Sequence, residues 1–119
     1  MKKGKKISGG KYNKRRKKKL YESPGQKRVV KLGDEKRKSK RTRSGKRKFF
    51  LLKAKFINIK TKKGVKKLEI KKVVETPADR FLARQNVITK GTIVETDLGK
   101  VKVTNRPSQE GILNGILIE

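Results

Sequence analysis

The net charge of the chain is confined to one part of its length. Residues 1–72 contain 32 Lys and Arg against 4 Asp and Glu, whereas residues 73–119 contain 6 of each kind. Because like charges oppose compaction unless a polyanion neutralises them, the excess of +28 restricts where a stable core can form. Only 31% of the 119 residues are hydrophobic. The pattern predicts a near-neutral folding unit with a basic apparatus attached to it.

The composition excludes several kinds of chemistry. The chain contains no Cys and no His, which removes disulfides, thiolate nucleophiles, zinc fingers and the commonest general base. Carboxylates are few, and neither a phosphate-binding loop nor a nucleotide-binding glycine pattern occurs. No apolar stretch follows Met1–Gly4, and no long apolar run occurs elsewhere. We therefore expect no enzyme, no cofactor, no metal site and no membrane segment.

The first 26 residues are interpreted as a separate unit. They lack a usable apolar period, so we expect them to be extended and disordered until bound. The Ser23-Pro24-Gly25 stretch is a turn signal that closes this unit. Residues 27–119 are then predicted to be the β-barrel core, with a short strand at Arg28–Leu32 and a basic loop over residues 33–48.

The second half of the chain follows the period of β-strands. Leu52, Ala54 and Phe56 alternate with lysines, and the phase then slips at Ile57. A strand with a β-bulge near that step accounts for the slip. The Lys62-Lys63-Gly64 stretch is a candidate hairpin turn leading to a return strand.

One short helix is expected after these strands. Thr76 can cap it, Pro77 suits its first position, and Asp79 favours the positive end of the helix dipole. Asn86 is a plausible stop. Further strands are expected over residues 92–96, 100–104 and 112–118. A mostly β chain with one short helix and several turn-separated strands favours a small β-barrel.

The basic run KYNKRRKKK, residues 11–19, is the strongest functional signal. Such a run can bind a nucleic-acid backbone by neutralising phosphates and releasing their counterions. It can also be a solvated tail or a nuclear localisation signal. Tyr12 and Tyr21 bracket the run, either to stack on unpaired bases or to anchor the tail on the core. Ser8-Gly9-Gly10 before it is either a hinge or a place where backbone approaches phosphate closely.

Two further groups of basic residues are interpreted either as solvated surface or as contacts to nucleic-acid phosphates. The RTRSGKRK stretch, residues 41–48, is either a charged hairpin turn or a backbone contact on one rim of the barrel. Arg80 and Arg84 lie four residues apart, on the helix face opposite Phe81. They form either a solvated face or a pair of guanidinium groups that suits two phosphates.

Part of the chain resembles a known protein family. Residues 76–111, TPADRFLARQNVITKGTIVETDLGKVKVTNRPSQEG, are similar to the C-terminal signature of the small-subunit ribosomal protein eight family of the e-type, shared by archaea and eukaryotes. The length matches the short archaeal form. The chain departs from the family pattern in having no Trp and in the strongly basic character of residues 36–40.

The same family's N-terminal motif also resembles the opening of this chain. There, Ser or Thr precedes two small residues, a spacer, a basic cluster and an aromatic residue or Leu followed by Glu. The matching residues here are Ser8, Gly9, Gly10, Lys17, Lys19, Tyr21 and Glu22.

The resemblance implies a structural protein of the cytoplasmic 30S subunit. Its barrel would be joined to an extension threaded into 16S-type rRNA, with neighbouring small-subunit ribosomal proteins as partners and no homo-oligomer. A related alternative is a ribosome-biogenesis factor, and a rival from another class is a chromatin-like nucleic-acid compacting protein. The candidate RNA-binding residues are Ser8, Gly9, Gly10, Lys11, Tyr12, Lys14, Arg15, Arg16, Lys17, Lys18, Lys19, Tyr21, Arg41, Arg43, Lys46, Arg47, Lys48, Arg80, Arg84, Lys90 and Arg106.

The charge partition generates a prediction about folding. Removing residues 1–26 should leave a folded domain, because the apolar periodicity begins after them. The truncated chain should show a cooperative thermal transition by circular dichroism. A featureless, non-sigmoidal melt would show that the extension belongs to the core.

Overall fold

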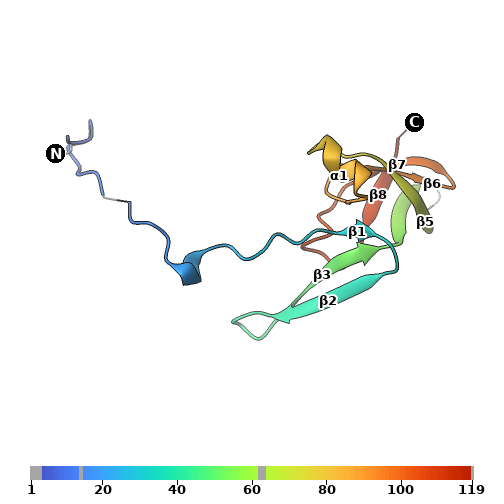
Figure 1. The fold of residues 1–119 in the computed structure, drawn as a ribbon, viewed down its shortest axis with the longest axis horizontal. Coiled ribbons are helices and arrows are strands. Elements are labelled where there is room, and N and C mark those ends of the chain that lie inside the picture. Colours follow the sequence, from blue (N-terminus) through green and yellow to red (C-terminus); the bar gives the residue numbers. More distant parts are fainter. Residues whose placement is uncertain (1–3, 14, 62–63, 119) are drawn as a thin grey trace.

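The fold consists of a basic extension, a three-stranded sheet and a closed five-stranded barrel (Figure 1). The computed structural model describes residues 4–13, 15–61 and 64–118. In chain order the elements are η1 (Leu20–Glu22), β1 (Lys31–Leu32), β2 (Lys36–Arg41), β3 (Arg47–Ala54), β4 (Phe56–Thr61), β5 (Gly64–Glu75), α1 (Arg80–Arg84), β6 (Ile93–Thr96), β7 (Gly99–Val103) and β8 (Asn114–Leu117). The predicted fold class, mostly β with a small barrel and one short helix, is confirmed.

The barrel is formed by β4 to β8. Strands β4 to β8 follow one another as antiparallel neighbours, and β8 returns to pair in parallel with β4. Alternate residues point inward, as strand geometry requires. Ile57, Ile59, Val94 and Val101 are fully buried in this way. Closure leaves the barrel without an unpaired strand edge.

Gly115 of β8 makes the closure possible. It pairs with Ile59 of β4 on one side and with Val103 of β7 on the other. A Cβ at this position would lie 2.5 Å from Cγ1 of Val101 and 2.8 Å from Cδ1 of Ile57. Both distances are shorter than van der Waals contact, so only glycine fits at the point where the last strand meets the first.

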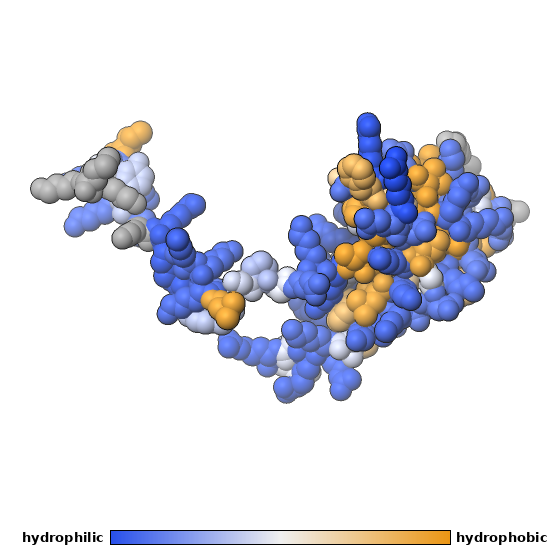
Figure 2. Space-filling model, viewed as in Figure 1, coloured by the Kyte–Doolittle hydropathy of each residue, from blue (hydrophilic) through white to orange (hydrophobic). Residues whose placement is uncertain are grey.

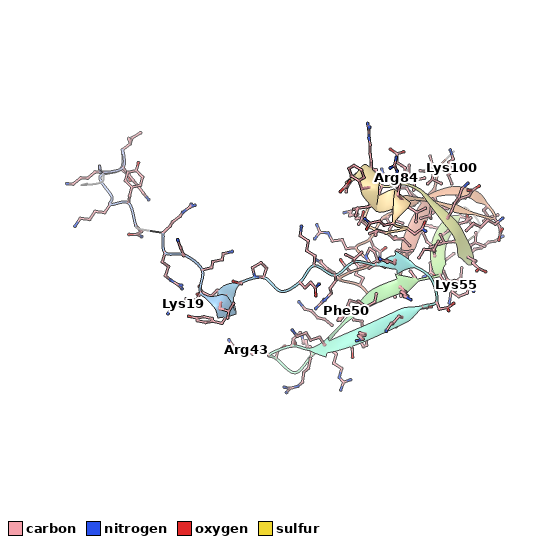
Figure 3. All side chains as sticks on the ribbon, viewed as in Figure 1. Lys19, Arg43, Phe50, Lys55, Arg84 and Lys100 are labelled. Carbon is pink, nitrogen blue, oxygen red and sulfur yellow. The ribbon has the colours of Figure 1, made fainter. Side chains whose placement is uncertain are left out.

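The phase slip predicted as a bulge is a change of sheet. β3 pairs with β1 and β2, ends at Ala54, and is followed by β4 of the barrel from Phe56. Lys55 lies at the junction (Figure 3). Leu51 and Ala54 are buried on the three-stranded sheet and Ile57 is buried in the barrel, while Phe56 between them remains exposed. The bulge interpretation is therefore wrong.

The basic loop predicted over residues 33–48 is also partly wrong. Lys36–Arg41 is strand β2, whose six residues are all exposed. It pairs antiparallel with β3 and lies at the edge of the three-stranded sheet. An edge strand can form without an apolar face of its own when a neighbour supplies the hydrogen bonds, and charged residues protect its free edge. Hydrophobic periodicity therefore carried no signal for β2.

Helix α1 starts later than the sequence pattern predicts. The side chain of Asp79 accepts a hydrogen bond from Phe81 N–H at 2.9 Å and is the N-cap. Thr76, predicted as the cap, is buried, and its hydroxyl donates to the Val87 carbonyl at 3.4 Å. Asn86 has a φ of +53°, a conformation that Asn adopts more readily than most residues. The predicted stop at Asn86 is confirmed.

A single hydrophobic core joins the sheet to the barrel. Val30, Leu51 and Ala54 belong to the same buried cluster as the barrel residues, and the cluster reaches Leu113. The Cα radius of gyration is 20.3 Å, against roughly 13.5 Å for a compact chain of this length. The larger radius reflects the extension. The extension is almost entirely hydrophilic, whereas the hydrophobic residues gather on the folded part (Figure 2). The proposed division at residue 26 stays a prediction.

The geometry at Gly115 predicts a specific loss of stability. Gly115→Ala should lower the free energy of unfolding by about 1–3 kcal/mol, the usual effect of overpacking a core. Gly25→Ala is the matched control, because its added Cβ meets no atom within 4 Å. Chemical denaturation of both variants measures the difference. Equal midpoints would show that the β4–β8 closure tolerates a side chain.

Candidate nucleic-acid interface

The β2–β3 hairpin places like charges directly opposite one another. Lys40 pairs with Lys48, and Arg41 pairs with Arg47. Like charges at facing positions destabilise a sheet. Among the residues that the structure describes, no carboxylate forms an ion pair with any residue of β2 or β3. The hairpin therefore presents repelling cations without an acidic partner.

A tight turn connects these two strands. The Gly45 N–H donates to the Thr42 carbonyl at 3.0 Å, and the Thr42 N–H donates to the Lys46 carbonyl at 2.7 Å. Gly45 has a φ of +84°, as a type I turn with a glycine bulge requires. The tip carries Arg43 (Figure 3) and projects away from the barrel (Figure 1). Residues 41–48 thus form a charged hairpin in the three-stranded sheet, so their predicted position on the rim of the barrel is wrong. Their contact with a nucleic-acid backbone stays a prediction.

The glycines near the N-terminus form a turn of the same type. The Gly9 N–H donates to the Lys6 carbonyl at 2.9 Å, and the Lys6 N–H donates to the Gly10 carbonyl at 2.9 Å. Lys5 and Lys11 form an antiparallel bridge beside it. Gly9 has a φ of +76°, whereas Gly10 is not in the left-handed region. The extension is therefore not uniformly extended, and the two glycines have different backbone conformations.

The basic run contains its own ion pair. The guanidinium of Arg16 donates two hydrogen bonds to the Glu22 carboxylate, at 2.6 and 2.8 Å, and Lys19 N–H adds a third at 3.1 Å. These contacts hold the pKa of Glu22 below its ordinary value, with Arg16 as the main cause. The Arg16 side chain is 63% exposed and the Glu22 side chain 30%, so the pair stabilises little in water. Lys14 lies outside the described residues.

The remaining basic side chains of the run are solvent-exposed and have no ion-pair partner among the described residues. They are Lys11, Arg15, Lys17, Lys18 and Lys19.

The two tyrosines lie on the extension and not in the core. Tyr12 is 54% exposed and Tyr21 is 77% exposed. Lys6 Nζ lies 5.7 Å from the centre of the Tyr12 ring, and Lys19 Nζ lies 5.8 Å from that of Tyr21. These contacts are within cation–π range. The anchoring alternative is therefore wrong, and each tyrosine presents an aromatic face beside a cation.

Arg80 and Arg84 are both exposed on α1. The half-buried residues of this helix are Leu82 and Ala83, and Ala83 packs against the core. Phe81, predicted to lie on the helix face opposite the arginines, is itself 67% exposed. A helix of five residues begins and ends within about one turn, so its burial follows the adjoining loops more than a helical stripe.

Lys90 and Arg106 lie close to two basic residues that were not among the candidate RNA-binding residues. Together with Lys27 and Arg28 they line one hollow beside α1. Arg28 also stacks on Phe50, with its guanidinium carbon 3.8 Å from the ring centre. Local sequence patterns held no signal for Lys27 and Arg28, because the hollow joins three separate segments of the chain.

Another cation of the hairpin lies close to a glycine. The guanidinium of Arg37 lies over the Phe49 ring, 4.4 Å from its centre. A Cβ at Gly111 would clash with Nε of Arg37. Arg37 therefore lies close against the backbone at Gly111, which links β2 to the loop before β8.

Ion pairs neutralise more of the positive charge in the barrel than in the hairpin. Lys71 contacts Asp97 at 2.8 Å, and Lys72 contacts Glu95 at 3.0 Å. The Asp97 carboxylate raises the pKa of Lys71. Uncompensated positive charge therefore concentrates on the extension, the hairpin and the hollow beside α1.

The described residues give no sign of two other kinds of site. Within them, no helix is long and apolar enough to cross a membrane. No group of three or more acidic side chains that could hold a metal ion occurs in the same part of the chain.

The fold and its surface define a class of protein, the small and highly basic β-barrel with a cationic extension. The chain belongs to the ribosomal protein S8e family, whose model matches residues 1–118. This confirms the resemblance inferred from residues 76–111. The family is one of non-enzymatic ribosomal proteins, so the expectation that the chain is not an enzyme is confirmed as well.

Archaeal relatives cover nearly the whole chain. It is 44% identical over 117 residues to a protein of Staphylothermus marinus named small ribosomal subunit protein eS8, covering 96% of this chain and 91% of that protein. Proteins of the same name from Sulfolobus acidocaldarius and Nanoarchaeum equitans are 41% and 39% identical, each across 95% of this chain and 91% of its relative.

Proposed function

We propose that this chain is a structural constituent of the small ribosomal subunit that binds and stabilises 16S-type rRNA. The extension and the β2–β3 hairpin make the contacts, and the barrel fixes their position. The protein acts in the cytoplasm, within the 30S subunit and beside other small-subunit proteins. Family membership and the names of the archaeal relatives support the subunit.

The RNA-binding proposal rests on the like-charged residues that face one another across β2 and β3. Lys40 faces Lys48 and Arg41 faces Arg47, with no acidic partner among the described residues. Phosphates placed along the hairpin would turn this repulsion into attraction. Each phosphate contact also releases a condensed counterion, so the favourable free energy adds up along the hairpin and the run.

The extension and the folded part contribute differently in this proposal. The run over residues 11–19 acts through phosphates and is indifferent to base identity. Selectivity depends on RNA shape, read by surfaces of the folded part: residues 41–48, the pair Arg80 and Arg84, and the hollow that contains Lys90 and Arg106. A chromatin-like compactor would instead prefer duplex DNA and tolerate any sequence.

The salt dependence of binding tests the proposal. The variant Arg15→Ala, Lys17→Ala, Lys18→Ala should flatten the slope of log affinity against log salt by roughly two to three units, on the rule of about 0.7–0.9 per phosphate contact. Filter binding at several salt concentrations, with 16S-type rRNA and with unrelated RNA, measures the slope and the preference. The preference for 16S-type rRNA should change much less than the slope.

The barrel provides a control of equal charge. The variant Lys60→Ala, Lys66→Ala, Lys102→Ala removes three exposed barrel cations and should change the slope less. An unchanged slope with lost preference in the extension variant would mean that the run reads RNA structure directly. Tighter binding to duplex DNA than to 16S-type rRNA would favour the compacting alternative.

The turn at Gly9 predicts that the two N-terminal glycines respond differently to substitution. Gly9→Ala should weaken binding to 16S-type rRNA, because L-residues rarely adopt its φ of +76° and the turn must change. Gly10→Ala should bind as the natural chain does, since the nearest atom to an added Cβ is 3.7 Å away. Neither should alter the melting temperature, because the turn lies outside the core.

A synthetic chain with D-alanine at position 9 separates backbone shape from bulk. D-Alanine adopts positive φ but carries a methyl group, so binding should be retained if the turn is what matters. Equal losses from D-alanine at position 9 and L-alanine at either position would mean that phosphate approaches the glycine backbone directly.

A further inference from the structure

The hollow beside α1 has the size of a small-ligand site. It has a volume of about 430 Å³, within the range of roughly 300–1,000 Å³ usual for such sites. Three parts of the chain meet in it: the end of the extension at residues 27–30, the helix with the segment that follows it, and the loop at residues 106–108.

The floor of the hollow is apolar and rigid. Val30, Val87, Ile88 and Pro107 lie beneath it and are buried, and the apolar surface open to a ligand comes from Val29, which is 45% exposed, and the half-buried Leu82. The Ile88 N–H donates to the Val30 carbonyl at 2.8 Å, and the Pro107 carbonyl accepts from Leu51 N–H at 3.0 Å. Backbone hydrogen bonds therefore fix the floor from two sides, so the hollow exists before anything binds.

The rim of the hollow is strongly basic. Lys27, Arg28, Lys90 and Arg106 surround the floor, and all four side chains are exposed. Asp79 is the one carboxylate in the lining, and it already accepts the N-cap hydrogen bond from Phe81. An occupant that suits the hollow therefore combines an apolar part with a negative group for the rim. An unstacked nucleotide has both, in its base and its phosphate.

The position of Arg28 links this hollow to the hairpin. Arg28 also lines a second hollow, together with Lys40, Arg43, Lys48 and Phe50. Its guanidinium is held over the Phe50 ring, so it forms a fixed cation between the two hollows. An RNA strand bound along the hairpin would therefore find its next basic contact at the rim of the apolar hollow.

We propose that this hollow binds one unpaired nucleotide of the RNA, with the base on the apolar floor and the phosphate at the rim formed by Lys27, Arg28, Lys90 and Arg106. The inference rests on the proposed function and adds a base-binding site to it. Asp79 directs the phosphate to the basic side, and its carboxylate accepts a hydrogen bond from an amino group of the base.

The test places a negative charge in the hollow. Val29 lines it and is 45% exposed, so Val29→Glu repels the phosphate without removing a buried side chain. Val65→Glu is the matched control, since Val65 is exposed on β5 outside the hollow. Full-length chains are bound to 16S-type rRNA, and the RNA is treated with reagents that modify the edges of unpaired bases.

We expect the natural chain and Val65→Glu to protect the same unpaired nucleotide, and Val29→Glu to lose that protection alone. Affinity for the RNA should fall about tenfold or more in Val29→Glu, because like charges brought together across an interface cost several kcal/mol. Crosslinks mapped by mass spectrometry should join that nucleotide to peptides that contain Val29 or Ser108. Unchanged base protection in Val29→Glu would overturn the proposal.

A second variant keeps the test decisive if Val29→Glu does not fold. Lys90→Gln with Arg106→Gln should also expose the nucleotide, whereas Lys60→Gln with Lys100→Gln should not. In 30S particles assembled with the full set of small-subunit proteins, crosslinks from the hollow to another protein and not to RNA would overturn the proposal, because the occupant would then be a peptide. Absence of any rRNA protection by the natural chain would overturn the proposed function together with the hollow.

Discussion

Closure of the barrel between β8 and β4 is the constraint on which the rest of the structure depends. A chain with 31% hydrophobic residues can protect only a small core, and closure removes the strand edges that would otherwise remain unpaired. It requires a residue without a side chain where the strands meet Val101 and Ile57, and Gly115 meets that need. The buried residues around Gly115 are aliphatic and few. An added side chain at this position therefore cannot be accommodated by rearranging its neighbours.

The core also makes a repulsive hairpin tolerable. Leu51 and Ala54 of β3 are buried in the same cluster as the barrel, so β3 is held by apolar packing while β2 pairs with it by backbone hydrogen bonds. The like-charge pairs of β2 and β3 are then a cost that the free protein bears and that an anionic partner removes. In the proposed function, RNA phosphates bind the cations of the hairpin. The hairpin contains no acidic residue that would compete with the phosphates for these cations.

Some structural features followed from local sequence, and others did not. Asn86 ended the helix as predicted, because a single residue determines whether the chain can leave a helix in a left-handed conformation. Thr76 was a wrong cap, since its hydroxyl is used by Val87 in the interior. The strand β2 was missed because its partner β3 supplies its hydrogen bonds and its own residues are all polar. The slip at Ile57 was visible, but a change of sheet and a bulge give the same local pattern.

The sequence by itself determined the separation of charge from core, the β class of the fold and the family, because these follow from composition, short-range periodicity and a contiguous signature in residues 76–111. Only the tertiary structure decided that Lys27 and Arg28 share a hollow with Lys90 and Arg106, and that Arg37 lies against Gly111. These contacts join segments far apart in the chain. Their geometry is fixed by strand register and barrel closure, which no local pattern of residues encodes.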